Sequence, residues 1–296
     1  MLGKVWLIPI LSLTFALLAF ICGYIIAVSE GHVHAIWPFI SDTGTLPPES
    51  SIFSLFLNLS ALFLAISIYL RHRQIVEFYW HRHRIGGIWR CFSKIFLILG
   101  LISALGVSVV ANFQQHEAIL YIHYCGALTA FGGGLIYAWG QTIFSYIMSP
   151  KLVSKRISHI RFFLSTIATT AFFTMIVFGC ILGRHDGNNT TPEGYHMFAW
   201  TSDLPNYVEH TIGTCSEWVL AICFEIYIVT FAIELYGSTL HGPKLDIESV
   251  MGKCKCNNGD DTKSCCSKET EDTEASDGQP VSFIKLPEEE KKKQKC

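Results

Sequence analysis

Six apolar runs, each of a length that crosses a lipid bilayer, constrain the fold of this chain more than any other feature. A transmembrane helix needs about 20 predominantly apolar residues. Half of the 296 residues are hydrophobic and only 16% are charged, which is too apolar for a soluble domain. The runs are Val5 to Val28, Ile52 to Leu70, Ile95 to Ala111, Ala118 to Met148, Phe162 to Leu182 and Ser216 to Tyr236. They predict an all-α polytopic membrane protein in which six transmembrane helices form a bundle.

The first run has the position of a secretory signal peptide. The apolar core of a signal peptide, however, covers only about 7 to 15 residues. This run continues through Tyr24, Ile25 and Ile26 and has no clear small-residue cleavage site. We therefore expect it to be retained as the first transmembrane helix.

The distribution of Lys and Arg predicts the orientation of the helices. The connector from Arg71 to Lys94 and the connector after the fourth run are rich in basic residues, whereas the connectors on the opposite side contain only Arg184. Because basic loops stay in the cytoplasm, both termini are predicted to be cytoplasmic. Asn188 and Asn189 each begin an Asn-X-Thr sequon in the last exoplasmic loop, which makes them N-glycosylation candidates.

The composition changes sharply after Gly242. Residues 1–242 are predicted to form the transmembrane domain. Residues 243–296, which are poor in aromatic residues and rich in charge, are predicted to form a disordered cytoplasmic tail. The tail cysteines are palmitoylation candidates, or alternatively four zinc ligands, although their spacing is not the paired C-x-x-C of such sites; they are Cys254, Cys256, Cys265 and Cys266. We favour acylation and expect neither a metal nor a cofactor.

The notable polar residues within the apolar runs are Asn58 in the second, Gln141 in the fourth and Glu225 near the middle of the sixth. An intramembrane carboxyl group is costly when charged and is by default a functional candidate. Isolated Asn, Gln and protonated Glu side chains also form hydrogen bonds that hold helices together. We favour this structural interpretation.

The first basic connector combines cations with the aromatic residues Tyr79 and Trp80. Its arginines either fix the topology, which is the simpler interpretation, or bind anionic lipid headgroups, each contributing about 1 kcal/mol near the membrane surface. The candidates for headgroup binding are Arg71, Arg73, Arg82 and Arg84. Beyond the lipid bilayer the sequence identifies no protein partner, and we expect no nucleic-acid partner.

Histidines gather on the predicted exoplasmic side and at the outer ends of the helices; they are His32, His34, His116, His123, His185, His196 and His210. Imidazoles titrate between about pH 5 and 7. In an acidic lumen this face is therefore either a pH-sensitive switch or a set of ordinary interfacial polar residues.

Short motifs occur in order along the six runs: Ile40-Ser41-Asp42-Thr43-Gly44 with Pro47-Pro48-Glu49-Ser50, Val110-Ala111-Asn112-Phe113-Gln114, His123 with Gly126-Ala127, Gln141 with Ser145-Tyr146, His159-Ile160-Arg161, and Glu217-Trp218. In these motifs the chain resembles the damage-regulated autophagy modulator (DRAM) family, part of a larger group with the transmembrane protein 150 and Sfk-type proteins. The intact Asp42-Thr43-Gly44 is more similar to the DRAM branch. The cysteine-bearing tail matches neither branch.

The motif residues at the outer ends of the helices are expected to form one exoplasmic polar cap. Leu46-Pro47-Pro48 is incompatible with a helix and Asp42-Thr43-Gly44 predicts a turn, so the loop should present its side chains rigidly at the membrane surface. The members of the cap are Ser41, Asp42, Thr43, Gly44, Pro47, Pro48, Glu49, Asn112, Phe113, Gln114, His123, Glu217 and Trp218. As a hypothesis, the cap recognises a partner protein or a lipid headgroup.

The resemblance implies a multi-pass lysosomal or endosomal membrane protein that modulates autophagy without catalysis. The related branch implies instead a plasma-membrane organiser of phosphatidylinositol 4-kinase signalling. A third interpretation is an intramembrane lipid hydrolase that uses Asp42 with His32, His34 or His123. Asp42-Thr43-Gly44 also matches the tripeptide of aspartic proteases, but that chemistry needs a second aspartate within a β-fold. We therefore predict a protein that is not an enzyme.

Overall fold

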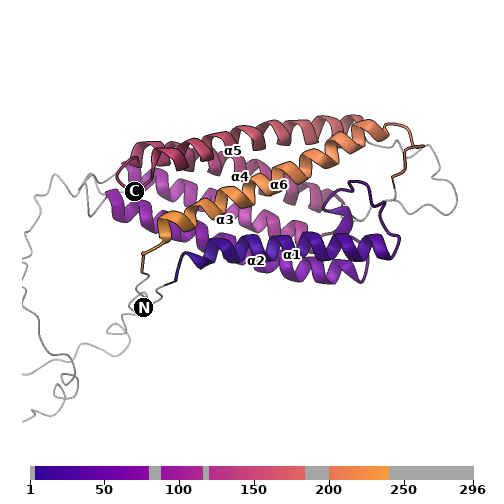
Figure 1. Cartoon of the computed structure of the whole chain (residues 1–296), viewed down its shortest axis with the longest axis horizontal. Helices are drawn as coiled ribbons and strands as arrows, with labels where there is room; N and C mark the ends of the chain where they lie inside the picture. Colours follow the sequence, from indigo (N-terminus) through magenta and orange to yellow (C-terminus); the bar gives the residue numbers. More distant parts are fainter. Residues whose placement is uncertain (1–3, 80–87, 116–119, 184–199, 240–296) are drawn as a thin grey trace, which may run out of the picture. The chain divides into compact units, whose positions relative to one another are not determined.

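The computed structural model describes residues 4–79, 88–115, 120–183 and 200–239. Within these ranges the chain is helical and contains no strand, which confirms the all-α prediction. Long helices run side by side along the molecule (Figure 1). They are α1 (Leu7–Ser29), α2 (Glu49–Glu77), α3 (Ile88–Asn112), α4 (Leu120–Met148), α5 (Lys155–Thr174), which continues as the π-helix η3 (Met175–Leu182), and α6 (Tyr207–Leu235); the 3-10 helix η1 (Asp42–Gly44) lies between α1 and α2.

Several predictions fall on residues that the structure does not describe. They concern the glycosylation candidates Asn188 and Asn189, the basic residues Arg82 and Arg84, and the tail with its four palmitoylation candidates, which all lie outside the described ranges.

In the part of the chain that the structure describes, five helices are long and apolar enough to cross a membrane. They are α1, α2, α3, α5 with η3, and α6. Helix α4 has 29 residues, as many as α2 and α6. It carries several tyrosines, three consecutive glycines and Gln141, which lower its hydropathy. A crossing by α4, and with it the number of six, stays a prediction.

The helices extend beyond the apolar runs. Helix α2 begins at Glu49 and continues to Glu77, and α6 begins at Tyr207, so the boundaries predicted from hydropathy are too short at these ends. In the last turns of α2, polar side chains bond to α6. Gln74 in the last turns of α2, for example, donates from Nε2 to the carbonyl oxygen of Glu234 on α6 over 3.2 Å.

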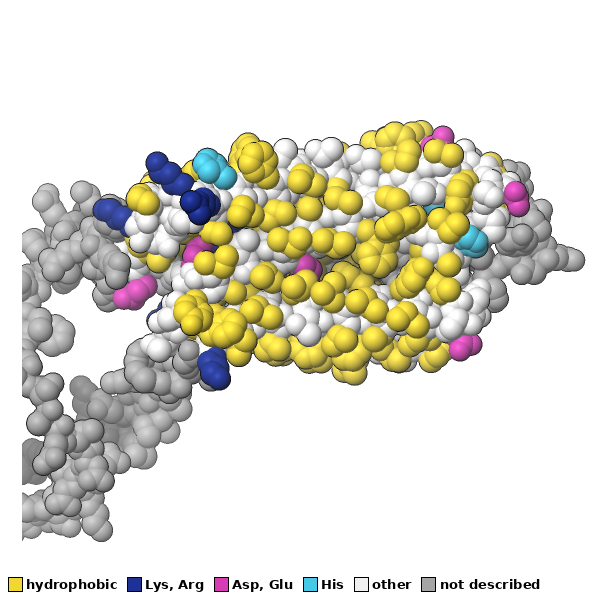
Figure 2. All heavy atoms as spheres, in the orientation of Figure 1, with side chains coloured by type: hydrophobic (Ala, Val, Ile, Leu, Met, Phe, Trp, Pro, Cys, Tyr) yellow, Lys and Arg dark blue, Asp and Glu magenta, His cyan; other side chains and the backbone are white. Residues whose placement is uncertain are grey.

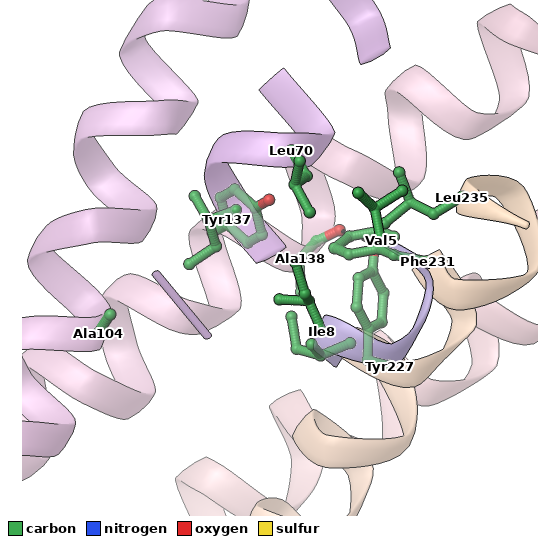
Figure 3. Close-up of a cluster of buried hydrophobic side chains, with 11 residues drawn as sticks. Val5, Ile8, Leu70, Ala104, Tyr137, Ala138, Tyr227, Phe231 and Leu235 are labelled. Atoms are coloured by element: carbon green, nitrogen blue, oxygen red, sulfur yellow. Dashed lines mark hydrogen bonds between the residues drawn. The ribbon is translucent and has the colours of Figure 1, made fainter. Parts of the chain in front are cut away.

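The helices pack in a defined order around an apolar core. Helix α1 packs on α2 and α6, α3 packs on α2 and α4, and α5 packs on α4 and α6. One core cluster brings together Val5, Leu70, Tyr137 and Phe231 from the N-terminal segment, α2, α4 and α6 (Figure 3). Segments far apart in the sequence therefore share one interior.

Glycines set the closest helix approaches. A Cβ atom added to Gly213 of α6 would lie 2.3 Å from the Cα of Gly179 in η3. A Cβ atom added to Gly106 of α3 would lie 2.6 Å from the backbone nitrogen of Ala130 in α4. Such approaches allow the extensive van der Waals contact that holds helices together in a membrane.

The two ends of the bundle differ in charge. We call the end that holds residues 30–48 the loop end, and the opposite end, where α2 ends and α3 begins, the arginine end. On the face shown in Figure 2, the Lys and Arg side chains of the described residues lie at the arginine end, and the surface between the ends is mostly hydrophobic. This polarity is the one that the positive-inside rule describes.

Candidate functional site

The loop between α1 and α2 is folded into the loop end of the bundle. The backbone N–H of Ile40 donates to Oε2 of Glu217 on α6 over 2.6 Å. The indole Nε1 of the next residue, Trp218, donates to the carbonyl oxygen of Pro38 over 2.9 Å. Two consecutive residues of α6 thus anchor the loop through its backbone.

Side-chain hydrogen bonds fix the loop conformation. Oγ1 of Thr43 donates to the carbonyl oxygen of Ile40 over 2.7 Å, and Oγ1 of Thr45 donates to that of Ser41 over 2.9 Å. Gly44 faces the ring of Phe53, and a Cβ atom there would lie 2.5 Å from two ring carbons. Only glycine fits this position without displacing the ring, so the short turn that the sequence predicted is also a packing surface.

Asp42 is buried within this loop, with 4% of its surface exposed. Burial and, secondly, the nearby Glu217 carboxylate raise the pKa of Asp42 well above its ordinary value, and a backbone hydrogen bond at Phe39 opposes them. Loss of hydration and a like charge both disfavour the ionised carboxylate. The loop is therefore most stable when Asp42 is protonated.

We predict that Asp42→Asn stabilises the protein at neutral pH. A raised pKa contributes stability that is present below the unfolded-state value of 3.8 and is lost as the pH rises through the folded-state pKa. Asn resembles the protonated acid at every pH. Thermal unfolding of both proteins in detergent should show a higher Tm for Asp42→Asn at neutral pH and a difference that shrinks as the pH approaches 4. A variant that is less stable than the native protein at neutral pH would contradict the conclusion that burial and Glu217 disfavour the charged form of Asp42.

Amide and imidazole groups join α2, α3 and α4 near the same end. Asn58 and Asn112 exchange two amide hydrogen bonds of 3.1 Å, and Oγ of Ser108 donates to Oδ1 of Asn58 over 2.6 Å. Nδ1 of His123 lies 2.7 Å from the carbonyl oxygen of Phe113, so this nitrogen is the protonated one. These groups connect helices.

Glu49 opens α2 and is also turned inward. Its carboxylate is fully buried, and Oε1 lies 2.6 Å from Nδ1 of His32. The pair thus holds the start of the loop to the start of α2.

Burial divides the predicted cap. The buried members are Ser41, Asp42, Thr43, Gly44, Glu49, His123 and Glu217; Gln114 and Trp218 are half-buried; Pro47, Pro48, Asn112 and Phe113 are exposed. The prediction that the loop presents its polar side chains at the membrane surface is wrong for the buried members. The loop turns inward because Glu217 and Trp218 bind its backbone and its small residues fit between α1 and α2.

A second buried polar site, which the sequence did not predict, lies at the arginine end. Arg71 of α2 and Arg161 of α5 are both 0% exposed, and both pair with the carboxylate of Glu234 on α6. Nη2 of Arg161 lies 2.6 Å from Oε1, and Nη1 of Arg71 contacts Oε2. We call these three residues the arginine cluster.

Helix α4 supplies neutral partners to the arginine cluster. Nε of Arg71 donates to Oε1 of Gln141 over 3.1 Å, and Nη1 of Arg161 donates to Oγ of Ser145 over 2.6 Å. Both guanidinium groups also lie over the ring of Phe231, at 5.1 Å for Arg71 and 4.7 Å for Arg161. The cluster therefore ties α2, α4, α5 and α6 together by charge-assisted hydrogen bonds.

The arginine cluster corrects one expectation. Arg71 is buried and paired, so it does not reach lipid headgroups, whereas Arg73 is exposed and stays a candidate. Gln141 is bonded within the cluster, as the structural interpretation of intramembrane polar residues expects. Glu234 was missed because it stands near the end of the last apolar run, where the sequence does not distinguish a buried carboxylate from one exposed at the membrane interface. A signal did exist, since Arg161 and Gln141 both belong to the motifs singled out above.

Comparison with known proteins gives a family match over the described bundle. Residues 4–238 match the Frag1/DRAM/Sfk1/Cwh43P N-terminal domain. No solved structure matches the chain.

Named relatives cover most of the chain. DNA damage-regulated autophagy modulator protein 2 from Bos taurus is 34% identical over 230 residues, which are 76% of this chain and 84% of the relative. DNA damage-regulated autophagy modulator protein 1 from Homo sapiens is 34% identical over 233 residues, 79% of this chain and 92% of the relative. Modulator of macroautophagy TMEM150B from Xenopus tropicalis is 38% identical over 157 residues, 52% of this chain and 64% of the relative.

Proposed function

We propose that this chain, which belongs to the Frag1/DRAM/Sfk1/Cwh43P family, modulates autophagy as a non-catalytic regulator in an endolysosomal membrane. The observation that carries this proposal is the match of nearly the whole bundle to relatives that are named autophagy modulators. The protein is a multi-pass membrane protein. We further propose six crossings, a cytoplasmic arginine end and a loop end that faces the lumen, in line with the charge polarity of the bundle (Figure 2).

The contacts of the loop end support a regulatory role over catalysis. Glu217 holds the backbone of Ile40, and His123 donates to the carbonyl oxygen of Phe113. These side chains serve the fold. A catalytic acid or base must instead reach a substrate. The exposed members of the cap, which are available for recognition, are Pro47, Pro48, Asn112 and Phe113, and Trp37 is also exposed.

The alternative role as an organiser of phosphatidylinositol 4-kinase at the plasma membrane has less support. The relative from the transmembrane protein 150 branch is itself named a modulator of macroautophagy. We therefore keep one function and treat exclusive plasma-membrane residence as the result that favours the alternative.

The proposal is tested by lysosomal degradation of long-lived proteins in cells that lack this protein and re-express it at native level. Re-expression of the native chain should change the rate at which long-lived proteins are degraded, and an inhibitor of lysosomal acidification should abolish this change. The protein should also co-localise with lysosomal markers. Glu217→Ala should lose this effect, because it removes the acceptor of the Ile40 N–H and leaves that group buried without a partner.

The matched control for Glu217→Ala is Glu30→Ala, which removes an exposed carboxylate from the same end of the bundle. It should behave as the native protein when both variants are expressed and localised equally. Degradation that does not respond to the native protein, or residence at the plasma membrane alone, contradicts the proposal.

A further inference from the structure

A cavity of about 120 Å³ lies inside the bundle between α2, α3, α4 and α6. Its walls are mostly aliphatic and aromatic, for example Leu57, Val107, Phe131 and Phe224. Lining residues on α6 run from Glu217 to Ile228, which is about 16 Å at a rise of 1.5 Å per residue. The cavity is therefore elongated, and Ile40 and Ser41 of the inserted loop line it together with Glu217.

Two polar groups in this cavity lack partners. Oε2 of Glu225 and the hydroxyl of Tyr137 are buried and make no hydrogen bond within the described residues. Tyr137 is only 3% exposed. Both residues line the cavity, and no Lys or Arg is among the lining residues described. Glu225 is half-buried, and its Oε2 is the oxygen that lies buried without a hydrogen bond. A buried polar atom without a partner is costly, so a ligand that bonds to Oε2 of Glu225 or to the Tyr137 hydroxyl is stabilised in this cavity.

We propose that this cavity binds a small amphiphilic primary amine. The ammonium group supplies the counter-charge of Glu225 and donates a hydrogen bond to its Oε2, and the Tyr137 hydroxyl is a second acceptor that lines the same cavity. The rings of Phe131, Phe224 and Tyr227, which also line the cavity, suit a cation because aromatic faces attract ammonium groups. A hydroxyl ligand fits the hydrogen bonds but leaves the charge of Glu225 unpaired.

The volume limits the apolar part of the amine. An apolar protein cavity of about 150 Å³ is known to hold benzene, so the present cavity accommodates an alkyl or ring group of that order. Larger lipids require the inserted loop or the helices to move. The ligand class is thus a short-chain or single-ring primary amine that partitions into the membrane.

The test uses two photoreactive probes of the same carbon skeleton, each with a diazirine and an alkyne, one a primary amine and the other the corresponding alcohol. The full-length protein is labelled in nanodiscs of neutral phosphatidylcholine. The amine should label α3, α4 or α6 around the cavity, and n-hexylamine should compete. Glu225→Gln, which keeps the shape of the side chain, should reduce amine labelling roughly tenfold, the loss expected when a charge-assisted hydrogen bond is removed.

Controls separate the amine site from general partitioning. Glu30→Gln makes the same change at an exposed carboxylate and should label as the native protein does. Tyr137→Phe should reduce amine labelling by a smaller factor, because only one acceptor is lost. The inference is overturned if the amine labels native protein and Glu225→Gln equally, if it does not label the cavity, or if the alcohol labels it as strongly and with the same dependence on Glu225.

Discussion

Glu234→Ala is expected to destabilise the bundle by about 3 to 5 kcal/mol, the range seen when one partner of a buried ion pair is removed. Alanine leaves the guanidinium groups of Arg71 and Arg161 buried without a carboxylate, although both are fully inaccessible. Their neutral partners on α4 do not offset two like charges that share one site. Thermal or denaturant unfolding of purified protein in detergent should show the loss, together with reduced yield.

A triple variant distinguishes a structural clamp from an indispensable charge. Arg71→Met, Arg161→Met and Glu234→Leu together remove all three charges and keep apolar volume. Replacement of a whole buried ion cluster by hydrophobic residues is often neutral or stabilising. We therefore expect the triple variant to recover most of the stability that Glu234→Ala loses. If Glu234→Ala unfolds at the same temperature as the native protein, the cluster is not buried as described.

Gly213→Ala is expected to disrupt the crossing of α6 and η3. The added Cβ would lie 2.3 Å from the Cα and 2.5 Å from the nitrogen of Gly179, so only movement of the backbone relieves the overlap. Overpacking of this kind typically costs about 1 to 3 kcal/mol. The Tm of the variant in detergent should fall accordingly.

Gly132 of α4 provides the matched control for this substitution. A Cβ atom there meets Leu128 Cδ1 at 3.6 Å, which is ordinary contact. Ala is favoured over Gly in a helix by up to about 1 kcal/mol, so Gly132→Ala should leave the Tm unchanged or raise it. Equal Tm changes for the two variants would contradict the close approach of Gly213 and Gly179.

Hydropathy predicted the helices well because each run of apolar residues must cross or line an apolar medium. It could not predict their ends. Arg71 and Gln74 continue α2 beyond the apolar run, since they bond to α6 inside the bundle. Charge alone does not distinguish a buried arginine from one at a lipid surface, and the partner of Arg71 is 163 residues away in the sequence.

The sequence predicted which residues gather at the loop end, but it did not predict that their side chains face the interior of the bundle. Motifs gathered Asp42, Glu217 and Trp218 at one end of the helices, where the structure also brings them together. A polar loop between transmembrane helices is ordinarily at the surface. Its burial depends on the acceptor Glu217 and on the glycines that make room for it, Gly23 and Gly44, which lie on three different segments. The fit between these segments arises only when the chain is folded, so the sequence alone could not predict it.

Insertion of the Pro38–Ser50 loop into the bundle underlies the site, the cavity and the role of Glu217. Labelling of single cysteines in intact membranes with a membrane-impermeant maleimide, applied to the loop side, tests it directly. Thr43, which is 0% exposed, and Trp37, which is 55% exposed, are replaced one at a time by Cys, with the native chain as background. We expect strong labelling of Trp37→Cys and background labelling of Thr43→Cys until the protein is unfolded. Equal labelling of both variants in folded protein would contradict the insertion of the loop.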